Sequence, residues 1–147
     1  MPTLRNESTR NRLIQRLHNL TPDSHPQWGT LDAPRMICHL GDTLAMGLGD
    51  VRTPSVNANP ILRFVLKYLI FYVMPMPKGL PTTTELLATP PASFEADRLC
   101  AIQLIARLAA TPCTLGPTHP FFGPLTNDEW NVLQWKHIDH HLKQFGL

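Results

Sequence analysis

The chain has 147 residues, of which 43% are apolar, 16% charged and 7% aromatic, and its formal net charge is +2. This length is typical of one domain with its own hydrophobic core, so we expect a single domain over residues 1–147. The apolar share excludes wholesale disorder, and the small, scattered positive charge argues against nucleic acid as a partner.

The cysteines and the apolar runs indicate the cellular compartment of the protein. Cys38, Cys100 and Cys113 are an odd number at wide spacings, which fits neither a disulfide framework nor a zinc ribbon. We therefore expect a cytoplasmic setting, and residues 1–12 contain no apolar secretory signal. The most apolar run, 61–74, is too short and too charged to span a membrane. It is interpreted as a helix that covers the fold, with an interfacial membrane contact as the alternative.

Two amphipathic helices are predicted in the first third of the chain. Residues 4–20 place leucines and an isoleucine at helical spacing, opposite arginines and a glutamine. A second helix is signalled by Asp32 as a cap and Pro34 in the first turn, and it should end at about Leu48, before Gly49.

Prolines interrupt the middle of the chain. The apolar helix at 61–74 is followed by residues 75–91, where the prolines exclude a helix and leave either a mobile lid or a packed surface loop. Ser93 is a plausible cap for a helix to about Ala110. Residues 111–125 are again broken by prolines and glycines, and Thr126 with Glu129 predicts a capping box that opens the last helix.

No stretch shows a strand-like alternation of useful length. The pattern predicts an all-α fold: an up-and-down four-helix bundle with one short accessory helix between the second and third helices. The loops at 51–60, 75–91 and 111–125 are the segments available to cover a site.

Two histidines of the last helix point the same way. His137 and His141 are one turn apart, roughly 40° apart around the axis, on an arc shared with Trp130 and Gln144. Two imidazoles in a bundle core need partners for their nitrogens. Either they share a divalent ion, or they are core histidines hydrogen-bonded to carbonyl groups or water.

A third ligand can be sought among the other histidines. His39 lies at the edge of the apolar stripe of the second helix and can face inward, whereas His119, in a loop, is the second choice. His140 points about 60° away from His137, toward the rim. Asp42 follows His39 by three residues, where it can hydrogen-bond a ring nitrogen or, as the favoured interpretation, face water.

These residues carry a resemblance to a known family. Met36-Ile37-Cys38-His39-Leu40-Gly41-Asp42, together with His137-x-x-His140-His141-x-x-Gln144, resembles the DinB-like superfamily of four-helix bundles. That superfamily includes the YfiT-like metal-dependent hydrolases and thiol-dependent S-transferases. The resemblance covers nearly the whole chain, and Leu20-Thr21-Pro22-Asp23-Ser24 and His119-Pro120-Phe121-Phe122-Gly123 are similar to a branch known as a domain of unknown function.

The resemblance implies a site and a chemistry. It implies that His39, His137 and His141 hold one divalent transition metal, with zinc or nickel expected and iron as a further choice. It also implies hydrolysis or thiol transfer on a small-molecule substrate, with a low-molecular-weight thiol as a second cofactor. Relatives often have Arg-Gly-Gln after the double histidine, whereas here Leu142-Lys143-Gln144 keeps only the glutamine, so an arginine-dependent thiol anchor is missing.

Further residues are assigned around this site. Candidate acid, base or ligand-orienting groups are Asp42, His119 and His140. A substrate pocket is expected from Trp28, Phe121, Phe122, Trp130 and Gln144, although core packing is the alternative for each aromatic residue. The competing function is a non-catalytic helical module that forms a homodimer or binds another partner through residues 61–74 and carries a structural or vestigial metal site.

Overall fold

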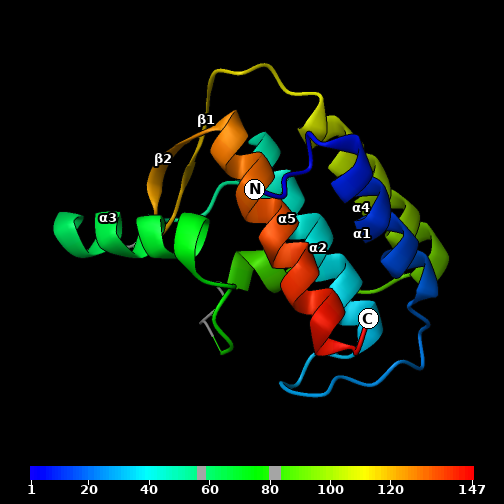
Figure 1. Ribbon diagram of the computed structural model, residues 1–147. Helices are drawn as coiled ribbons and strands as arrows, with labels where there is room; N and C mark the ends of the chain where they lie inside the picture. The colour runs from blue at the N-terminus through cyan, green and yellow to red at the C-terminus, as the bar shows by residue number, and fades with distance from the viewer. Residues whose placement is uncertain (56–58, 80–83) are drawn as a thin grey trace.

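The computed structural model describes residues 1–55, 59–79 and 84–147 (Figure 1). These residues form five α-helices, a π-helix, a 3₁₀ turn and a two-stranded antiparallel sheet. In chain order the elements are α1 (Glu7–Asn19), α2 (Ala33–Leu48), α3 (Pro60–Tyr68), the π-helix η1 (Leu69–Val73), the 3₁₀ turn η2 (Thr84–Leu87), α4 (Phe94–Ala109), β1 (Leu115–His119), β2 (Gly123–Thr126) and α5 (Asn127–Gln144). In this described part of the chain, no helix combines the length and the apolar character needed to span a membrane.

The ends of the two histidine-bearing helices are fixed locally. The Asp32 carboxylate accepts a hydrogen bond from the Arg35 amide at 2.8 Å, and Gly49, with φ 84°, closes α2 in the left-handed conformation that favours glycine. Thr126 Oγ1 accepts from the Glu129 amide while the Glu129 carboxylate accepts from the Thr126 amide, which completes the capping box. The predicted boundaries of α2 and α5 are therefore confirmed.

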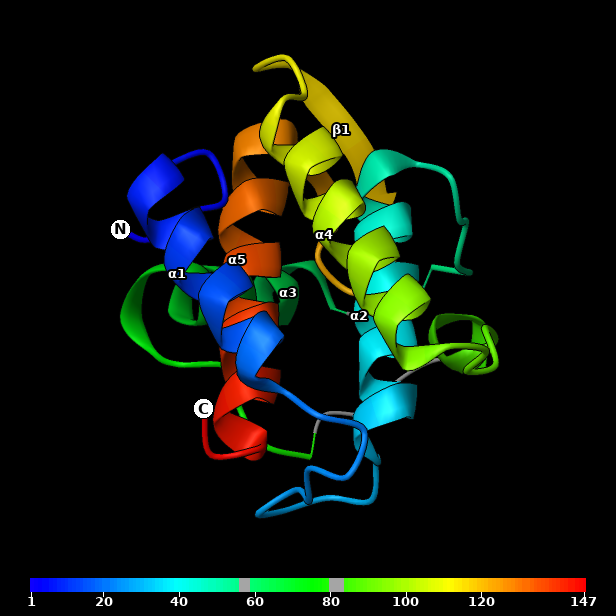
Figure 2. The same cartoon turned by 90° about the vertical axis from the view of Figure 1, so that its right-hand side faces the viewer.

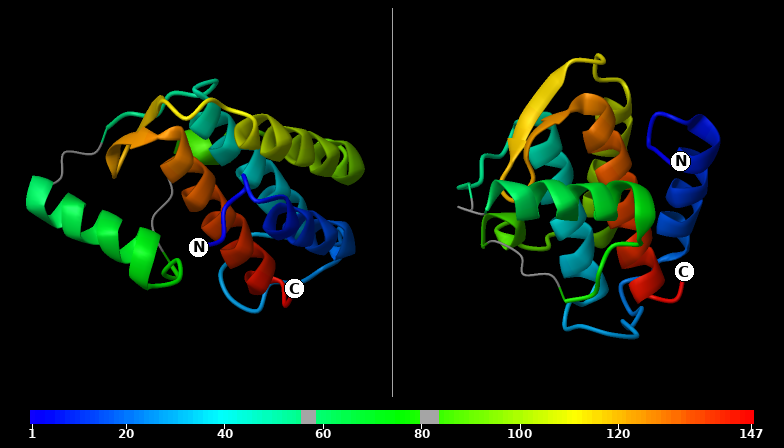
Figure 3. Two further views of the ribbon diagram at one scale, coloured as in Figure 1. Left: turned by 45° about the horizontal axis from the view of Figure 1, so that its top comes forward. Right: turned by 60° about the vertical axis from the view of Figure 1, so that its left-hand side comes forward.

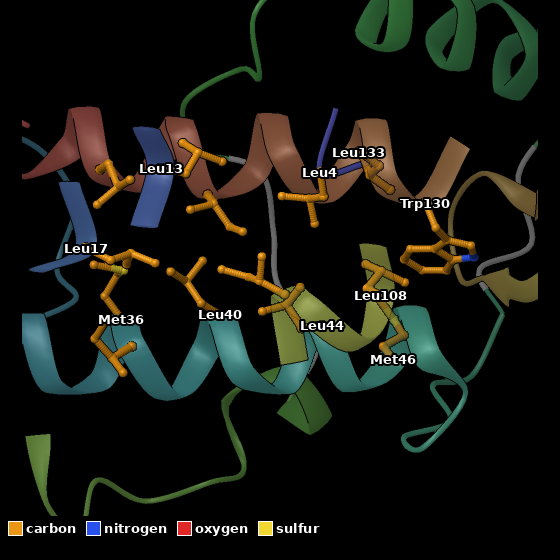
Figure 4. Packing of buried hydrophobic residues seen from close by; sticks show 14 of the residues in the cluster. Leu4, Leu13, Leu17, Met36, Leu40, Leu44, Met46, Leu108, Trp130 and Leu133 are labelled. Atoms are coloured by element: carbon orange, nitrogen blue, oxygen red, sulfur yellow. The ribbon is translucent and has the colours of Figure 1, made fainter. Parts of the chain in front are cut away.

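Four helices pack side by side around one core. Helix α5 lies against α1 and α2, and α2 also packs along α4 (Figures 1 and 2). Between α2 and α5, Leu40, Leu44, Leu133 and Trp130 meet in the layer shown in Figure 4, and none is more than 4% exposed. Burying a side chain of this size stabilises the fold by about 1.5–3 kcal/mol.

The prediction of a purely helical, up-and-down four-helix bundle is wrong. Residues 115–126 form an antiparallel hairpin, in which Leu115 pairs with Thr126 and His119 with Gly123. Its strands have five and four residues, and the register shifts between Leu115 and Thr118, so no alternating pattern survives in the sequence. The hairpin covers the start of α5, where the Trp130 indole Nε1 donates to the Pro117 carbonyl at 2.8 Å.

Gly116 is needed for this packing. A Cβ at this position would lie 2.8 Å from Trp130 Cδ1 and 2.5 Å from Asn127 Oδ1, closer than carbon atoms approach such neighbours. The glycine thus lets the hairpin backbone pass directly over the indole ring.

The predicted helix at 61–74 is helical but divided. It runs as α3 to Tyr68 and continues as the π-helix η1, and the left view of Figure 3 shows α3 set apart from the other helices. Lys67 forms a 2.7 Å ion pair with Glu129, and the Lys136 ammonium donates to the carbonyls of Ile70 and Met74. These polar contacts join the segment to α5, and its Ile70 and Phe71 are buried in the core cluster.

Two of the three loops proposed as covers, 51–60 and 75–91, are described only in part, because residues 56–58 and 80–83 lie outside the described residues. Beyond the second gap, Leu86 of η2 is 8% exposed and Thr89 is hydrogen-bonded to the Asp42 carboxylate. Of the two interpretations of residues 75–91, the packed surface loop therefore holds for 84–89.

Candidate metal centre

Three imidazoles from two helices converge, with their ligand atoms all within 4.8 Å of one another. His39 comes from α2, and His137 and His141 stand one turn apart on α5. His137 Nε2 lies 3.2 Å from His39 Nε2 and 3.1 Å from His141 Nε2. His39 and His141 are buried, whereas His137 keeps some exposed surface.

Two of these rings are oriented by oxygen acceptors behind them. His39 Nδ1 lies 2.7 Å from the Leu86 carbonyl oxygen, and His141 Nδ1 lies 2.8 Å from Gln144 Oε1. Both oxygens can only accept, so we assign the ring protons to Nδ1. The lone pairs of His39 and His141 are then on Nε2, facing the centre of the triad.

The same assignment holds for His137. Its Nδ1 is 3.4 Å from Thr43 Oγ1, and the Thr43 hydroxyl has a nearer acceptor of its own, the Leu40 carbonyl at 3.0 Å. Since the hydroxyl proton is used there, Thr43 Oγ1 is free to accept from His137 Nδ1. All three Nε2 atoms then present unprotonated lone pairs to one another.

The environment keeps these rings neutral. Burial lowers the pKa of His141 to about 3, with the nearby His39 adding to the effect. Burial also lowers the pKa of His39 and, together with His141, holds the pKa of His137 well below its usual range. Neutral imidazole is the form that binds metal ions.

The arrangement fits a divalent ion. The His137 Nε2 lone pair lies 3.1–3.2 Å from those of His39 and His141, and such lone pairs repel one another unless a cation lies between them. A tetrahedral ion with nitrogen ligands at about 2.0–2.1 Å separates those nitrogens by about 3.3–3.4 Å, close to these two distances. Across residues 1–55, 59–79 and 84–147, the group consists of these three side chains without a fourth ligand. Three imidazoles and an open position suit zinc, nickel, iron or copper.

Asp42 does not face water, which corrects the favoured interpretation of this residue. It is 8% exposed, and its carboxylate accepts from the Thr89 hydroxyl at 2.5 Å and from the Thr89 amide at 3.3 Å. These bonds hold the segment after η2 against α2. The preceding turn η2 supplies the Leu86 carbonyl to His39, so Asp42 supports the site through the backbone next to that turn.

His119 lies in the hairpin, outside the triad. Its Nδ1 accepts from the amides of Phe121 and Phe122, each at 3.1 Å, and its ring centroid is 5.3 Å from that of Trp130. Phe122 and Trp130 are buried in the core cluster, and Phe121 packs against it. These aromatic residues fill the hairpin layer instead of lining an open pocket.

Trp28 and His140 border a surface cleft whose lining, in the described part of the chain, does not include the triad histidines. The cleft has a volume of about 420 Å³ and is also lined by residues 73–76 and by Lys78. Lys78 Nζ lies 3.8 Å from the centre of the Trp28 ring, and the His140 ring is 5.3 Å from that of His141. The predicted pocket residues are therefore divided, since Trp28 borders the cleft, the other aromatics fill the hairpin layer and Gln144 orients His141.

Sequence reasoning missed two groups that orient the ligands. Thr43 follows His39 by four residues, so helical spacing could have placed it on the same side of α2. Leu86 contributes a main-chain carbonyl, for which the sequence carries no signal. Gln144, predicted as a pocket residue, instead joins His141 to the Trp28 carbonyl, to which its Nε2 donates at 2.6 Å.

The comparisons with known proteins give one family. Neither a search of curated proteins nor a search of solved structures found a match to this chain. A family model described as "Protein of unknown function (DUF1569)" matches residues 9–146, which include all three histidines of the triad. The chain therefore belongs to the DUF1569 family.

Proposed function

We propose that this protein is a metal-dependent enzyme in which His39, His137 and His141 hold one divalent transition metal and leave a position open for chemistry. The observation that carries the proposal is the convergence of three Nε2 lone pairs whose Nδ1 atoms all face oxygen acceptors. A histidine cluster that served only packing would pair its nitrogens with donors and acceptors in alternation.

The chain's own groups would each have a defined task. A divalent ion held here supplies Lewis acidity, which lowers the pKa of water or of a thiol enough to give a nucleophile near neutral pH. Leu86, Thr43 and Gln144 fix the three rings. In this proposal His140 accepts or donates a proton, which is supported by its position at the cleft, and the cleft has the size of a small-molecule site.

The reaction class follows from the resemblance to the DinB-like superfamily, and membership of that superfamily is part of the proposal. Hydrolysis and transfer of a low-molecular-weight thiol both need an open metal position and little else from the protein. The arginine that follows the double histidine in many relatives is absent, because the buried Leu142 stands at its position, and the next residue, Lys143, forms an ion pair with Asp139. Hydrolysis is therefore the simpler expectation.

The test is elemental analysis of protein purified without a histidine tag. We expect close to one transition-metal ion per chain, and its loss in His39→Ala, His137→Ala and His141→Ala. His18→Ala and His25→Ala serve as matched controls, because both residues are exposed histidines outside the triad. Metal-free wild-type protein that also binds no added zinc or nickel would refute the proposal.

A second candidate function is a non-catalytic interaction module with a structural or vestigial metal site. It is favoured by the outward apolar face of α3, which resembles a surface for a partner. X-ray absorption spectroscopy of the metal-loaded protein separates the two functions. A fourth protein ligand supports the structural site, and a bound water supports the enzyme.

A further inference from the structure

The exposed apolar residues of this protein are concentrated on one segment. Twelve large apolar side chains are exposed in the described part of the chain, and eight of them belong to α3, η1 and the next residue. We call these eight the outer face: Ile61, Leu62, Phe64, Val65, Tyr68, Tyr72, Val73 and Met74. Phe64 is 70% exposed and Ile61 74%, in contrast to the buried Ile70 and Phe71 of the same segment.

The segment has its polar and apolar sides reversed relative to a helix that covers a core. Lys67 points to the protein and pairs with Glu129 of α5. Arg63 lies beside Gly123 of the hairpin, since a Cβ on that glycine would be 3.2 Å from the Arg63 guanidinium. Both cationic side chains of α3 are thus turned inward, and the outer face is uncharged.

A face of this size is rare on a monomer. Side chains of this kind cover roughly 150–250 Å² each, so at 39–74% exposure the eight together present on the order of 900 Å². A stable dimer buries about 800 Å² on each partner, whereas apolar patches on monomers are commonly about 300–600 Å². The area therefore matches one side of a standard protein interface.

We propose that the outer face packs against the outer face of a second copy of this chain, about a two-fold axis. Such a contact places the same patch on both partners, so an uncharged apolar face is complementary to itself. A lipid surface is disfavoured because interfacial helices present lysine and arginine toward the headgroups, and here Arg63 and Lys67 face the protein.

The proposed dimer contact adjoins the cleft that Trp28 and His140 border. Val73 and Met74 belong to the outer face and also line the cleft that holds Trp28 and His140. A second copy seated on the outer face therefore stands at the edge of this cleft. The dimer does not depend on the metal, because no residue of the triad lies in the outer face.

The test is sedimentation velocity of the full-length protein over a concentration series. We expect a dimer at about 10 μM, as for a standard interface of ordinary affinity, and a monomer for the Phe64→Glu/Tyr68→Glu variant. Leu99→Glu/Leu115→Glu is the matched control, because both leucines are exposed outside the outer face, and this variant should remain a dimer. Circular dichroism and metal content should be the same for all three proteins, which separates this test from that of the metal centre.

Three results would overturn the proposal. The first is a wild-type protein that stays monomeric up to the highest soluble concentration. The second is a dimer that Phe64→Glu/Tyr68→Glu leaves intact. The third is a monomer that co-sediments with vesicles of phosphatidylcholine and phosphatidylglycerol and loses this binding in the same variant, which would assign the outer face to lipid.

Discussion

Helices α3 and α5 are both amphipathic, but they use their two sides in opposite ways. α5 buries Leu133, Ile138 and Leu142 and turns two histidines inward, where the rings meet a third from α2. α3 turns its two cations toward the protein and its apolar side outward. An amphipathic pattern therefore establishes that a helix has two unlike sides, and the surrounding structure decides which side is covered.

The largest expected effect contrasts two leucines, one from each environment. Leu44→Ala removes a fully buried side chain between α2 and α5 and should lower the free energy of unfolding by about 2–5 kcal/mol. Leu62→Ala, at a position that is 53% exposed on α3, should change it by no more than about 0.5 kcal/mol. Urea denaturation at the lowest practical protein concentration measures both. Equal losses would mean that α3 buries its outer side within the monomer.

A smaller effect concerns the orientation of His141. Gln144→Leu removes the acceptor of the His141 Nδ1 proton and should weaken metal binding by about 10–100-fold, measured by competition with a chelator. Gln144→Glu keeps an oxygen at this place and should retain most of the affinity. If both variants bind metal as the wild type does, the ring is held by other contacts.

His119 gives a test through pH. Burial lowers its pKa to about 4 from the ordinary 6.5, so the unfolded chain takes up a proton below pH 6.5 that the folded chain refuses until about pH 4. This residue's contribution to stability is therefore complete above pH 6.5 and is lost as the pH falls toward 4. His119→Asn keeps an acceptor for the amides of Phe121 and Phe122 without titrating, and should reduce the pH dependence of the unfolding free energy over this window by the share of this one residue. An unchanged slope would contradict the burial of His119.

The smallest expected effect concerns the ion pair that joins α3 to α5. Lys67 and Glu129 form a 2.7 Å ion pair whose side chains are each about a quarter exposed, so a double-mutant cycle with Lys67→Ala and Glu129→Ala should give a coupling of about 0.2–1 kcal/mol. Glu129 also caps α5, and for this reason the cycle is needed in place of the single variant. Zero coupling would show that this ion pair does not hold α3 on α5 and that the other contacts of the segment, among them Ile70, Phe71 and the Lys136 bonds, do.

The helices were predictable because their signals are local. The capping box of Thr126 and Glu129 defines the start of α5, and α2 begins at the Asp32 cap and ends at Gly49. Each of these caps joins atoms that are only a few residues apart. The hairpin was missed because its strands are short, contain Pro117 and Pro124, and are irregular in register. Its turn depends on the His119 imidazole accepting two main-chain amides, a contact that the sequence does not announce.

The candidate site was likewise predictable only in part. The sequence by itself determined that His137 and His141 share one side of a helix and that His39 can face inward, because a regular helix fixes which side chains align. Only the tertiary structure brought the three Nε2 atoms together and placed the Leu86 carbonyl and Thr43 hydroxyl behind the rings. It likewise decided that the apolar side of α3 faces outward. These results come from contacts between segments far apart in the chain, and helical spacing carries no information about them.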